Sequence, residues 1–295
     1  MKIAVTGAGG FIGSAVLAHL EQAGHQAVRI TRDTLAKPDF SGVEAIIHCA
    51  GIAHKTGRNA ADPAEMDAVN HHLVLSLAAQ ARDAGVSRFV FVSSINVVAG
   101  QPSPLTVNMP YHPLSAYGEA KALAEQGLLK MQGIECVIAR PALTYGAGAP
   151  GNLQSLLRLC DSRLPLPFGC ADHQRSFVSL NNVVRGLEFL AQAQRSKVAG
   201  RIFHLADPLP LATKQLVILF RQMMSRPRNL MPVPRFVMKA GLVLLGKQAM
   251  YEQLFENMII DGHDLEEAGF RYADNTACLA DMQAMILGYL NKKAG

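Results

Sequence analysis

The chain has no cluster of basic residues. Its 28 Lys and Arg are spread along 295 residues and only slightly exceed the 23 Asp and Glu, which gives a net charge of +5. Proteins that bind nucleic acids usually carry runs or patches of Lys and Arg, so no nucleic-acid partner is expected. The small positive charge favours anionic ligands. With 49% hydrophobic and 17% charged residues, the chain is predicted to fold around a substantial core.

The five cysteines lack a metal-binding or disulfide pattern. They contain no C-x-x-C pair and no Cys/His ligand spacing, and their number is odd. Reduced thiols in the cytoplasm are therefore expected, and no metal site is predicted. The N-terminus passes directly into an apolar strand-like run, so a secretory signal is not predicted.

No apolar run is long enough to cross a bilayer. The apolar stretch 236–245 falls short of the roughly 20 residues that a spanning helix needs, and Lys239 and Lys247 interrupt it. We predict a core or interface helix here and no membrane insertion. The alternative is a peripheral contact in which Arg235, Lys239 and Lys247 face lipid headgroups.

Short apolar runs alternate with helical segments through the first half of the chain. This alternation is typical of an α/β fold in which right-handed crossovers place helices on both faces of a doubly wound parallel sheet. Strands are predicted at 2–6, 26–30, 44–48, 88–93 and 134–139, and helices at 12–23, 65–84 and 115–132.

Beyond residue 146 the alternation weakens, and a strand near 201–205 is expected to rejoin the sheet. We therefore predict a dinucleotide-binding Rossmann domain at 1–146, rejoined by 176–206, and a smaller, mostly helical substrate-binding lobe at 147–295. Helices of this lobe are predicted at 152–162, 181–195, 213–226 and 233–256.

The first strand leads into a glycine turn. Gly7, Gly10 and Gly13 are spaced by three and precede an Ala- and Leu-rich helix. Gly7 permits a tight turn, Gly10 lets a pyrophosphate approach the backbone, and Gly13 allows the helix to pack closely on the strand. Together with Phe11 and Ile12 at the start of the helix, these residues are the predicted dinucleotide site. The alternative is a glycine-rich turn without a ligand.

Tyr117 and Lys121 lie four residues apart in a segment built like a helix, which places both side chains on one face. A nearby ammonium favours the tyrosinate, so it is predicted to lower the phenol pKa from about 10. Ser94 ends an apolar strand, at the sheet edge where open parallel sheets bind ligands. These groups could exchange a proton with a substrate oxygen. The ordinary alternatives are an exposed Lys beside a half-buried Tyr, and a Ser that forms a turn or caps a helix.

The end of the second strand bears on the choice of nicotinamide cofactor. An Asp or Glu at this point holds the ribose 2′-hydroxyl of NAD, whereas the 2′-phosphate of NADP needs a cation. Thr31 occupies the position expected for the acid and Arg32 follows it, which favours NADP. NAD is the alternative, with Asp33 turned inward and Arg32 solvated.

In order and spacing, the glycine turn and the set Ser94, Tyr117 and Lys121 resemble the extended short-chain dehydrogenase/reductase superfamily. Within it, the chain is most similar to bacterial nucleotide-sugar epimerases and 4-ketoreductases, especially those that handle UDP-linked 2-acetamido-6-deoxyhexoses for surface polysaccharides. The similarity extends over nearly the whole chain. Further segments that carry it are 140–146, 151–152, 164–169, 174–183 and 251–255.

The resemblance implies further site residues. Pro141 and the small-residue turn Cys49-Ala50-Gly51 would border the cofactor, although a plain tight turn is the alternative for the latter. Arg175 and Asn152 would bind the substrate diphosphate, and Phe168 would line the pocket for the nucleotide base. An ordinary surface salt bridge is the alternative for Arg175.

Polar residues near the predicted groove have open roles. Asn70 is expected either to support a water-linked proton path to Lys121 or to cap a helix or brace the backbone. His54 could meet the sugar, but a plain loop residue is favoured, and His71 and His72 are expected on a helix surface.

The chain departs from the pattern of this superfamily after its second strand. Relatives place another helix and strand after the second strand, where this chain has only about fourteen residues before the third. The adenine side of the cofactor site is therefore expected to be incomplete or rebuilt by Asp39-Phe40.

The activity that the resemblance implies is NADP-dependent reduction of a UDP-4-keto-6-deoxyhexose at C4, with Ser94 and Tyr117 on the ketone oxygen and Lys121 on the nicotinamide ribose. A UDP-sugar 4-epimerase with tightly bound NAD uses the same residues and is the alternative. A non-catalytic dinucleotide sensor is a further one. Ile95-Asn96 replaces the Asp-Glu pair of 4,6-dehydratases, so dehydration is not expected. The fold is also compatible with a homodimer.

Overall fold

A sheet of six parallel strands forms the centre of the molecule, in the order β2-β1-β3-β4-β5-β9. The computed structural model describes residues 1–35, 37–52, 62–244 and 257–294. Every residue of β3 and β4 is buried, as expected for a parallel sheet with both faces covered. The strands are β1 (Lys2–Thr6), β2 (Gln26–Ile30), β3 (Ala45–His48), β4 (Arg88–Val92), β5 (Glu135–Pro141) and β9 (Ile202–Leu205).

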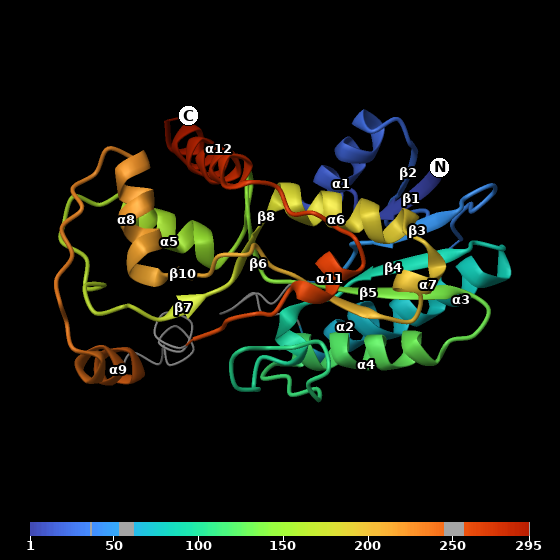
Figure 1. Ribbon diagram of the computed structural model, residues 1–295, viewed down its shortest axis with the longest axis horizontal. Coiled ribbons are helices and arrows are strands. Elements are labelled where there is room, and N and C mark those ends of the chain that lie inside the picture. Colours follow the sequence, from blue (N-terminus) through green and yellow to red (C-terminus); the bar gives the residue numbers. More distant parts are fainter. Residues whose placement is uncertain (36, 53–61, 245–256, 295) are drawn as a thin grey trace.

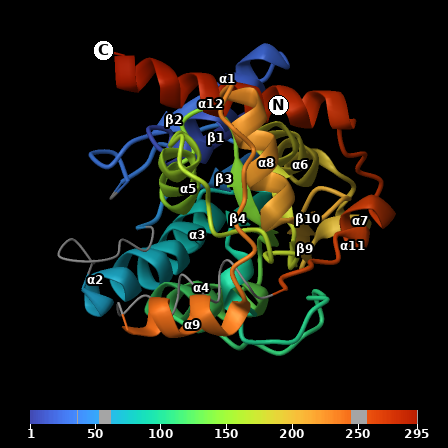
Figure 2. The same ribbon diagram turned by 90° about the vertical axis from the view of Figure 1, so that its left-hand side faces the viewer.

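Helices cover both faces of the sheet (Figure 1). On one face lie α1 (Phe11–Gln22) and α6 (Leu180–Gln192), and on the other lie α3 (Leu73–Asp83) and α4 (Ala116–Lys130). Figure 2 shows the strands between these two layers. Alternate strand residues fill two separate cores, because successive side chains of a strand point to opposite faces. The predicted doubly wound α/β fold is thus confirmed. Strand residues facing α6 include Val5, Ile47 and Val90, and those facing α3 include Ala4, Ile46 and Phe89.

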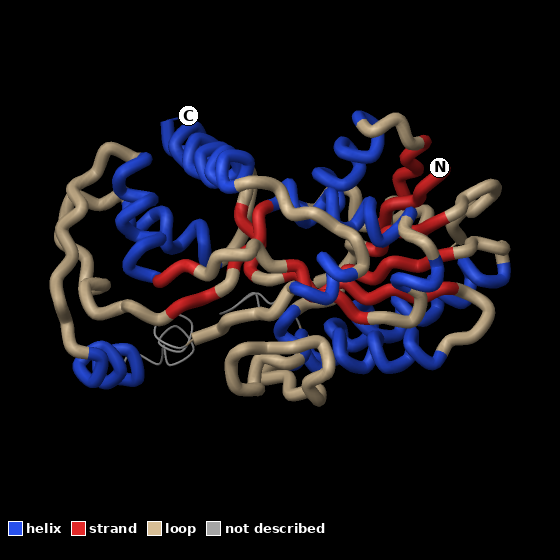
Figure 3. Tube along the Cα trace, viewed as in Figure 1, coloured by secondary structure: helices blue, strands red, loops and turns tan. Residues whose placement is uncertain are grey.

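A mostly helical lobe lies beyond the ends of β5 and β9 (Figures 1 and 3). It has its own apolar core, which includes Leu157, Phe168, Phe220 and Met285. The helical character of this part agrees with the prediction, whereas the division of the chain at residue 146 stays a prediction. The helices are α5 (Asn152–Cys160), α8 (Thr213–Met223), α9 (Arg235–Leu244) and α12 (Asn275–Ala294).

Short strands link the lobe to the sheet. The strand β6 (Leu143–Tyr145) runs parallel to β8 (Phe177–Ser179), and β7 (Gln174–Arg175) pairs antiparallel with β10 (Leu211–Ala212). These pairs and α12 were not expected from the sequence. The remaining short elements are α2 (Pro63–Asp67), the π-helical turn η2 (Ala68–His72), the 3-10 turn η3 (Ile95–Val97), α7 (Arg195–Val198) and α11 (His263–Glu267).

The sheet ends at β2, because the connection from β2 to β3 forms no strand in its described part, residues 31–35 and 37–44. Phe40 lies in this connection, and its side chain is buried against Ile30 and Val43 in the core under α3. Asp39 stays exposed and accepts a hydrogen bond from the Ser41 backbone. Phe40 therefore closes the core at the sheet edge instead of forming a wall of the cofactor site.

The predicted helix 233–256 corresponds to α9 up to Leu244, and residues 245–256, with Lys247 and the family-like segment 251–255, lie outside the described residues. Within the described ranges, no helix is long and apolar enough to span a membrane.

Candidate active site

The glycine turn has the close contacts that its spacing predicts. Gly7 has φ of +66°, and a Cβ atom there would lie 2.7 Å from the Ala50 nitrogen. A Cβ on Gly13 would collide with the Gly7 carbonyl, which instead accepts a hydrogen bond from the Gly10 N–H at 2.8 Å. Only glycine fits at these points. The turn thus brings the start of α1 close to the end of β3.

The N-terminus of α1 suits a diphosphate. Its N-cap residue, Gly10, offers no side-chain hydrogen bond to the helix, and the first turn holds no acidic residue. Gly9 and Gly10 are exposed, and a Cβ on Gly9 would meet nothing within 4 Å. Unpaired N–H groups and the helix dipole at such an end attract anions. Behind the turn, Ile12 packs on the sheet core, whereas Phe11 packs on the core of the lobe.

Ser94 and Tyr117 meet at the end of β4. The Ser94 hydroxyl lies close enough to the Tyr117 phenol to lower its pKa, and both residues are half-buried. The Ser94 oxygen also accepts from the Asn96 N–H at 3.2 Å, so it caps η3 as well. Tyr117 lies in the first turn of α4, which Ser115 caps by accepting from the Gly118 N–H. The cap therefore fixes the position from which the phenol projects.

Lys121 follows Tyr117 by one helical turn and is 3% exposed. Its ammonium donates a hydrogen bond to the Val92 carbonyl at 3.0 Å and lies 4.4 Å from the centroid of the Phe91 ring. Both contacts are at the end of β4, two or three residues before Ser94. The structure thus brings together the three predicted catalytic residues.

Burial controls the proton affinities of this group. It lowers the pKa of Lys121 to about 8, although Cys49 and Glu125 act in the opposite direction. It raises the pKa of Tyr117 to about 12, against the lowering effect of the Ser94 hydrogen bond. The predicted lowering of the Tyr117 pKa by Lys121 is therefore wrong for this structure, because burial is the largest influence on this pKa and acts in the opposite direction. At neutral pH the phenol is protonated and can act as an acid.

The turn after β3 reaches the same place. A Cβ atom on Gly51 would lie 3.4 Å from the Lys121 Nζ and 2.6 Å from the Asn70 Oδ1. Asn70 is fully buried, and its amide accepts from the Ile52 N–H and donates to the Ile52 carbonyl, both at 3.0 Å. Asn70 thus braces the backbone beside Lys121, which is one of the two roles expected for it. Burial also raises the pKa of Cys49 to about 12, which makes it an inert thiol.

A buried ion pair supports the site from behind. Arg140 on β5 donates to the carboxylate of Glu125, with Nη2 2.6 Å from Oε2, and Ser93 donates to the same carboxylate. Arg140 and Glu125 are at most 1% exposed. The sequence contains a signal for this support, since Glu125 follows Lys121 by one helical turn. A second unforeseen contact joins Thr6, whose hydroxyl accepts from the Ala50 N–H at 3.2 Å, to the Gly51 turn.

The residues at the predicted adenine end of the cofactor site are exposed. Thr31, Arg32 and Asp33 are all exposed, just after the edge strand β2. Thr31 and Thr34 bind each other locally. Neither Arg32 nor Asp33 forms an ion pair with another of the described residues. An exposed cation therefore follows the edge strand, with no ion-pair partner among the described residues.

The residues predicted to lie near the end of β5 or to bind the substrate differ in their burial. Pro141 is buried at the end of β5, beside Leu205. Asn152 is exposed at the start of α5, and Arg175, on β7, donates to the Met258 sulfur at 3.3 Å. Phe168 is 2% exposed in the lobe core, so its ring cannot stack on a base in this conformation. Phe168 packs in the lobe core instead of lining a pocket for a base. His54 lies outside the described residues.

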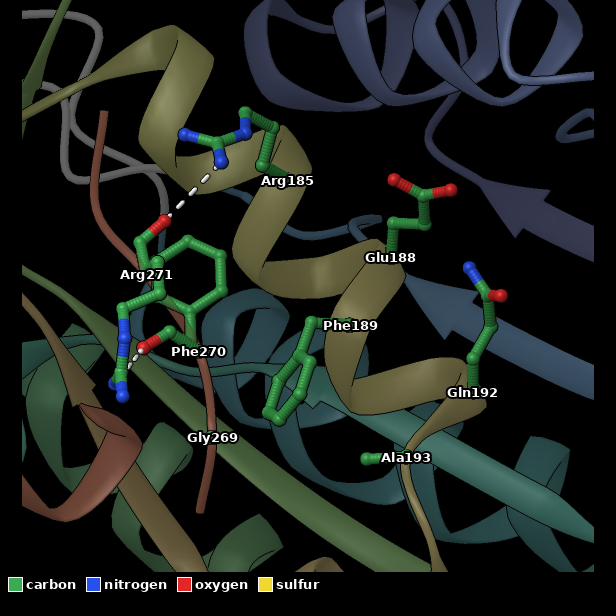
Figure 4. A pocket seen from close by; sticks show the side chains of 8 residues that line it. All are labelled: Arg185, Glu188, Phe189, Gln192, Ala193, Gly269, Phe270 and Arg271. Carbon is green, nitrogen blue, oxygen red and sulfur yellow. Dashed lines mark hydrogen bonds between the residues drawn. The ribbon is translucent and has the colours of Figure 1, made fainter. Parts of the chain in front are cut away.

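An open hollow of about 410 Å³ lies elsewhere, on the outer side of α6. Figure 4 shows Arg185, Phe189 and the backbone near Phe270 around it. Arg185 donates to the Arg271 carbonyl at 3.1 Å. None of the predicted site residues lines this hollow, so the hollow is not part of the candidate active site.

The parallel sheet with its glycine turn, and the meeting of Ser94, Tyr117 and Lys121 at the end of β4, are features expected of an NAD(P)-dependent enzyme. The profile of the NAD dependent epimerase/dehydratase family matches residues 3–206. The chain belongs to this family. Its predicted place in the extended short-chain dehydrogenase/reductase superfamily, and its nature as an enzyme, are thereby confirmed.

Individual relatives agree. UDP-glucose 4-epimerase from Vibrio cholerae is 32% identical over 254 residues, which cover 81% of this chain and 76% of that protein. UDP-glucose 4-epimerase from Thermotoga maritima, solved with UDP-glucose, has the same fold, with a TM-score of 0.76 at 20% identity over 100% of both chains. RMD from Pseudomonas aeruginosa, complexed with NADPH, gives a TM-score of 0.77 at 19% identity and covers 99% of this chain and 98% of its own.

Proposed function

We propose that the protein is an NADP-dependent nucleotide-sugar oxidoreductase that reduces the C4 ketone of a UDP-linked 4-keto-6-deoxyhexose. One observation carries the proposal: Ser94, Tyr117 and Lys121 meet at the end of β4, next to the turn at Gly51 that touches the phosphate turn. Acid, hydrogen-bond donor and cation are the groups that carbonyl reduction requires.

The residues have separate tasks. Bound NADPH supplies the hydride. The Tyr117 phenol, protonated at neutral pH, donates its proton to the oxygen of the substrate carbonyl as negative charge develops there. Ser94 donates a hydrogen bond to the same oxygen and keeps it in line with the phenol. The Lys121 ammonium stabilises the tyrosinate that is left and holds the nicotinamide ribose. The buried Asn70 keeps the turn at Gly51 close to Lys121.

The exposed Arg32 supports NADP as the cofactor. A guanidinium forms charge-assisted hydrogen bonds with phosphate, and at this strand end a carboxylate would repel the 2′-phosphate. The residue directly after β2 is Thr31, which carries no charge. Asp33 is exposed, so the alternative with Asp33 turned inward and NAD bound would require the loop after β2 to rearrange.

For the substrate, we propose that Arg175 and Asn152 bind the diphosphate. The proposal relies on the resemblance of their segments to those of nucleotide-sugar enzymes and on their places at the entrance to the lobe, on β7 and at the start of α5. A division into a cofactor domain at 1–146 and a substrate lobe at 147–295 fits this assignment. A homodimer and a cytoplasmic location are further parts of the proposal.

A 4-epimerase with tightly bound NAD is the second candidate, and the 32% identity to the Vibrio cholerae UDP-glucose 4-epimerase favours it. An epimerase oxidises C4 and then reduces it from the other face. It would use Tyr117 first as base and then as acid, with no net consumption of cofactor.

One pair of assays separates the candidates. Purified protein with NADPH and a UDP-4-keto-6-deoxyhexose should consume NADPH, whereas an epimerase should interconvert UDP-sugars without added reductant. The Tyr117→Phe variant should lose about 10²–10⁴-fold in kcat while it binds NADPH as before. Tight NADPH binding without turnover in either assay would favour a sensor. Full activity of the variant would refute Tyr117 as the acid.

A further inference from the structure

Asp67, His71 and His72 form a cluster outside the groove. Asp67 ends α2, and the two histidines end the π-helical turn η2. The His71 Nδ1 lies 3.0 Å from one carboxylate oxygen of Asp67, and the His72 Nε2 lies 3.0 Å from the other. All three potential ligand atoms lie within 4.8 Å of one another. Two imidazole nitrogens and a carboxylate oxygen thus converge on one point of the surface.

The π-helical turn explains why adjacent histidines reach the same carboxylate. In an α-helix, neighbouring residues project about 100° apart, so the residues at i+4 and i+5 cannot both stand over residue i. A π-helix closes its hydrogen bonds at i+5 and is wider, so both positions flank residue i. Accordingly, the ring centroids of His71 and His72 are only 4.3 Å apart. An α-helical spacing would place His71 and His72 on different sides of the helix. The sequence alone therefore predicts only two surface histidines here, not two that face one carboxylate.

We propose that Asp67, His71 and His72 bind a divalent late transition-metal ion such as Zn²⁺. Two imidazoles and a carboxylate are a frequent zinc ligand set, with water in the fourth position. Zinc bonds of about 2.0–2.2 Å need the ligand atoms to shift around the ion, and the side chains of Asp67 and His72 are 41% and 68% exposed, which leaves them room to rotate. Nitrogen ligands favour Zn²⁺, Co²⁺, Ni²⁺ and Cu²⁺ over Mg²⁺.

The charges around the cluster leave the carboxylate available. Among the residues that the structure describes, Asp67 contacts the two imidazoles and forms no ion pair with a Lys or Arg. A metal ion binds neutral imidazole and carboxylate, so it would replace the hydrogen bond between His71 and Asp67. The competing arrangement is a hydrogen-bonded His-Asp-His group without an ion.

An ion bound to this cluster would also affect the backbone beside Lys121. The turn η2 carries Asn70, which holds the backbone of Ile52 next to Gly51 and Lys121. A metal that ties the end of α2 to the end of η2 fixes the π-helical turn, and with it the position of Asn70. We expect the bound ion to stabilise the native chain, because it binds the folded form.

The test uses the full chain without a histidine tag, freed of metal by a chelator and titrated with Co²⁺, whose visible absorption reports tetrahedral coordination, and with Zn²⁺ by calorimetry. We expect one ion per chain, no displacement by excess Mg²⁺, and a rise in melting temperature. The double variant His71→Gln/His72→Gln and the variant Asp67→Asn should each bind the metal ion more weakly. Loss of a residue that only supports a metal ligand weakens binding by roughly 10–100-fold, so loss of a ligand itself should weaken it by at least as much.

His25→Gln is the matched control. His19 and His25 also share one carboxylate, that of Glu188. Among the described residues, however, the ligand atoms of this group do not all lie within 4.8 Å of one another, as those of the Asp67 cluster do. This variant should bind Co²⁺ like the unaltered chain. No saturable binding, unchanged binding in the double variant, or loss in the control would each overturn the proposal. Circular dichroism of the variants shows whether they are folded, and the result does not depend on turnover of any substrate.

Discussion

The two ends of the proposed cofactor site are built differently. At the catalytic end, Lys121 is buried, bonded to Val92 and backed by the ion pair of Glu125 with Arg140. At the adenine end, Arg32 is exposed on the loop that follows the edge strand β2. Interior packing therefore fixes the proposed catalytic groups, whereas the residue proposed to select the cofactor can change without disturbing the core. Substitutions at the two ends should separate stability from cofactor preference.

The largest effect is expected behind the catalytic end. Glu125→Gln removes one partner of a buried ion pair and leaves the Arg140 charge uncompensated, which should lower the free energy of unfolding by about 3–5 kcal/mol. Urea denaturation measures the change. The control is Glu119→Gln, an exposed position on the same helix, which should stay within about 0.5 kcal/mol. Equal effects of the two substitutions would contradict the contrast between buried and open parts of the site.

A smaller effect is expected at the phosphate turn. Gly13→Ala places a Cβ against the Gly7 carbonyl, and the strain should cost about 1–3 kcal/mol of stability and weaken NADPH binding. Gly9→Ala meets open space and should leave the free energy of unfolding nearly unchanged. Thermal denaturation of both variants without cofactor makes the comparison. A Gly13→Ala protein as stable as the unaltered one would mean that the turn is not tightly packed.

At the adenine end, a substitution should change the binding of the cofactor and leave the stability of the fold unchanged. Arg32→Ala should weaken NADPH binding by about tenfold, which corresponds to about 1.4 kcal/mol for a lost hydrogen bond to a charged group, and should leave NADH binding and stability unaffected. Arg29→Ala, an exposed arginine on β2 itself, serves as the control. Titration of both cofactors by fluorescence decides the matter, since an equal loss for NADH and NADPH would remove Arg32 from the phosphate site.

The last prediction concerns the pH dependence of stability. The pKa of Lys121 is about 8 in the fold, below its ordinary 10.5, so the unfolded chain binds more protons between these values. The free energy of unfolding should therefore rise with pH from about 8 to 10.5 at this residue, while reduction that needs the ammonium should slow above about pH 8. Lys121→Met should lack this part of the pH dependence of stability. A pH profile of unfolding identical in both proteins would show that Lys121 is not desolvated.

Much of the fold and of the catalytic set follows from local pattern. Strand runs, the glycine spacing, and the Tyr117 and Lys121 pair depend on neighbours within a few residues, and the structure places them as the sequence predicts. Phe168 and the pKa of Tyr117 depend on burial by distant segments, which local pattern does not reveal. The π-helical turn that unites His71 with His72 has no sequence signature of its own.

One side chain belongs to both halves of the molecule. Phe11 opens α1 directly after the glycine turn, yet it packs on the apolar core of the lobe. We expect that any shift of the turn on binding a dinucleotide would pass through the Phe11 ring to the lobe proposed to bind the sugar. A chain built in this way should prefer one order of ligand arrival, with the dinucleotide first.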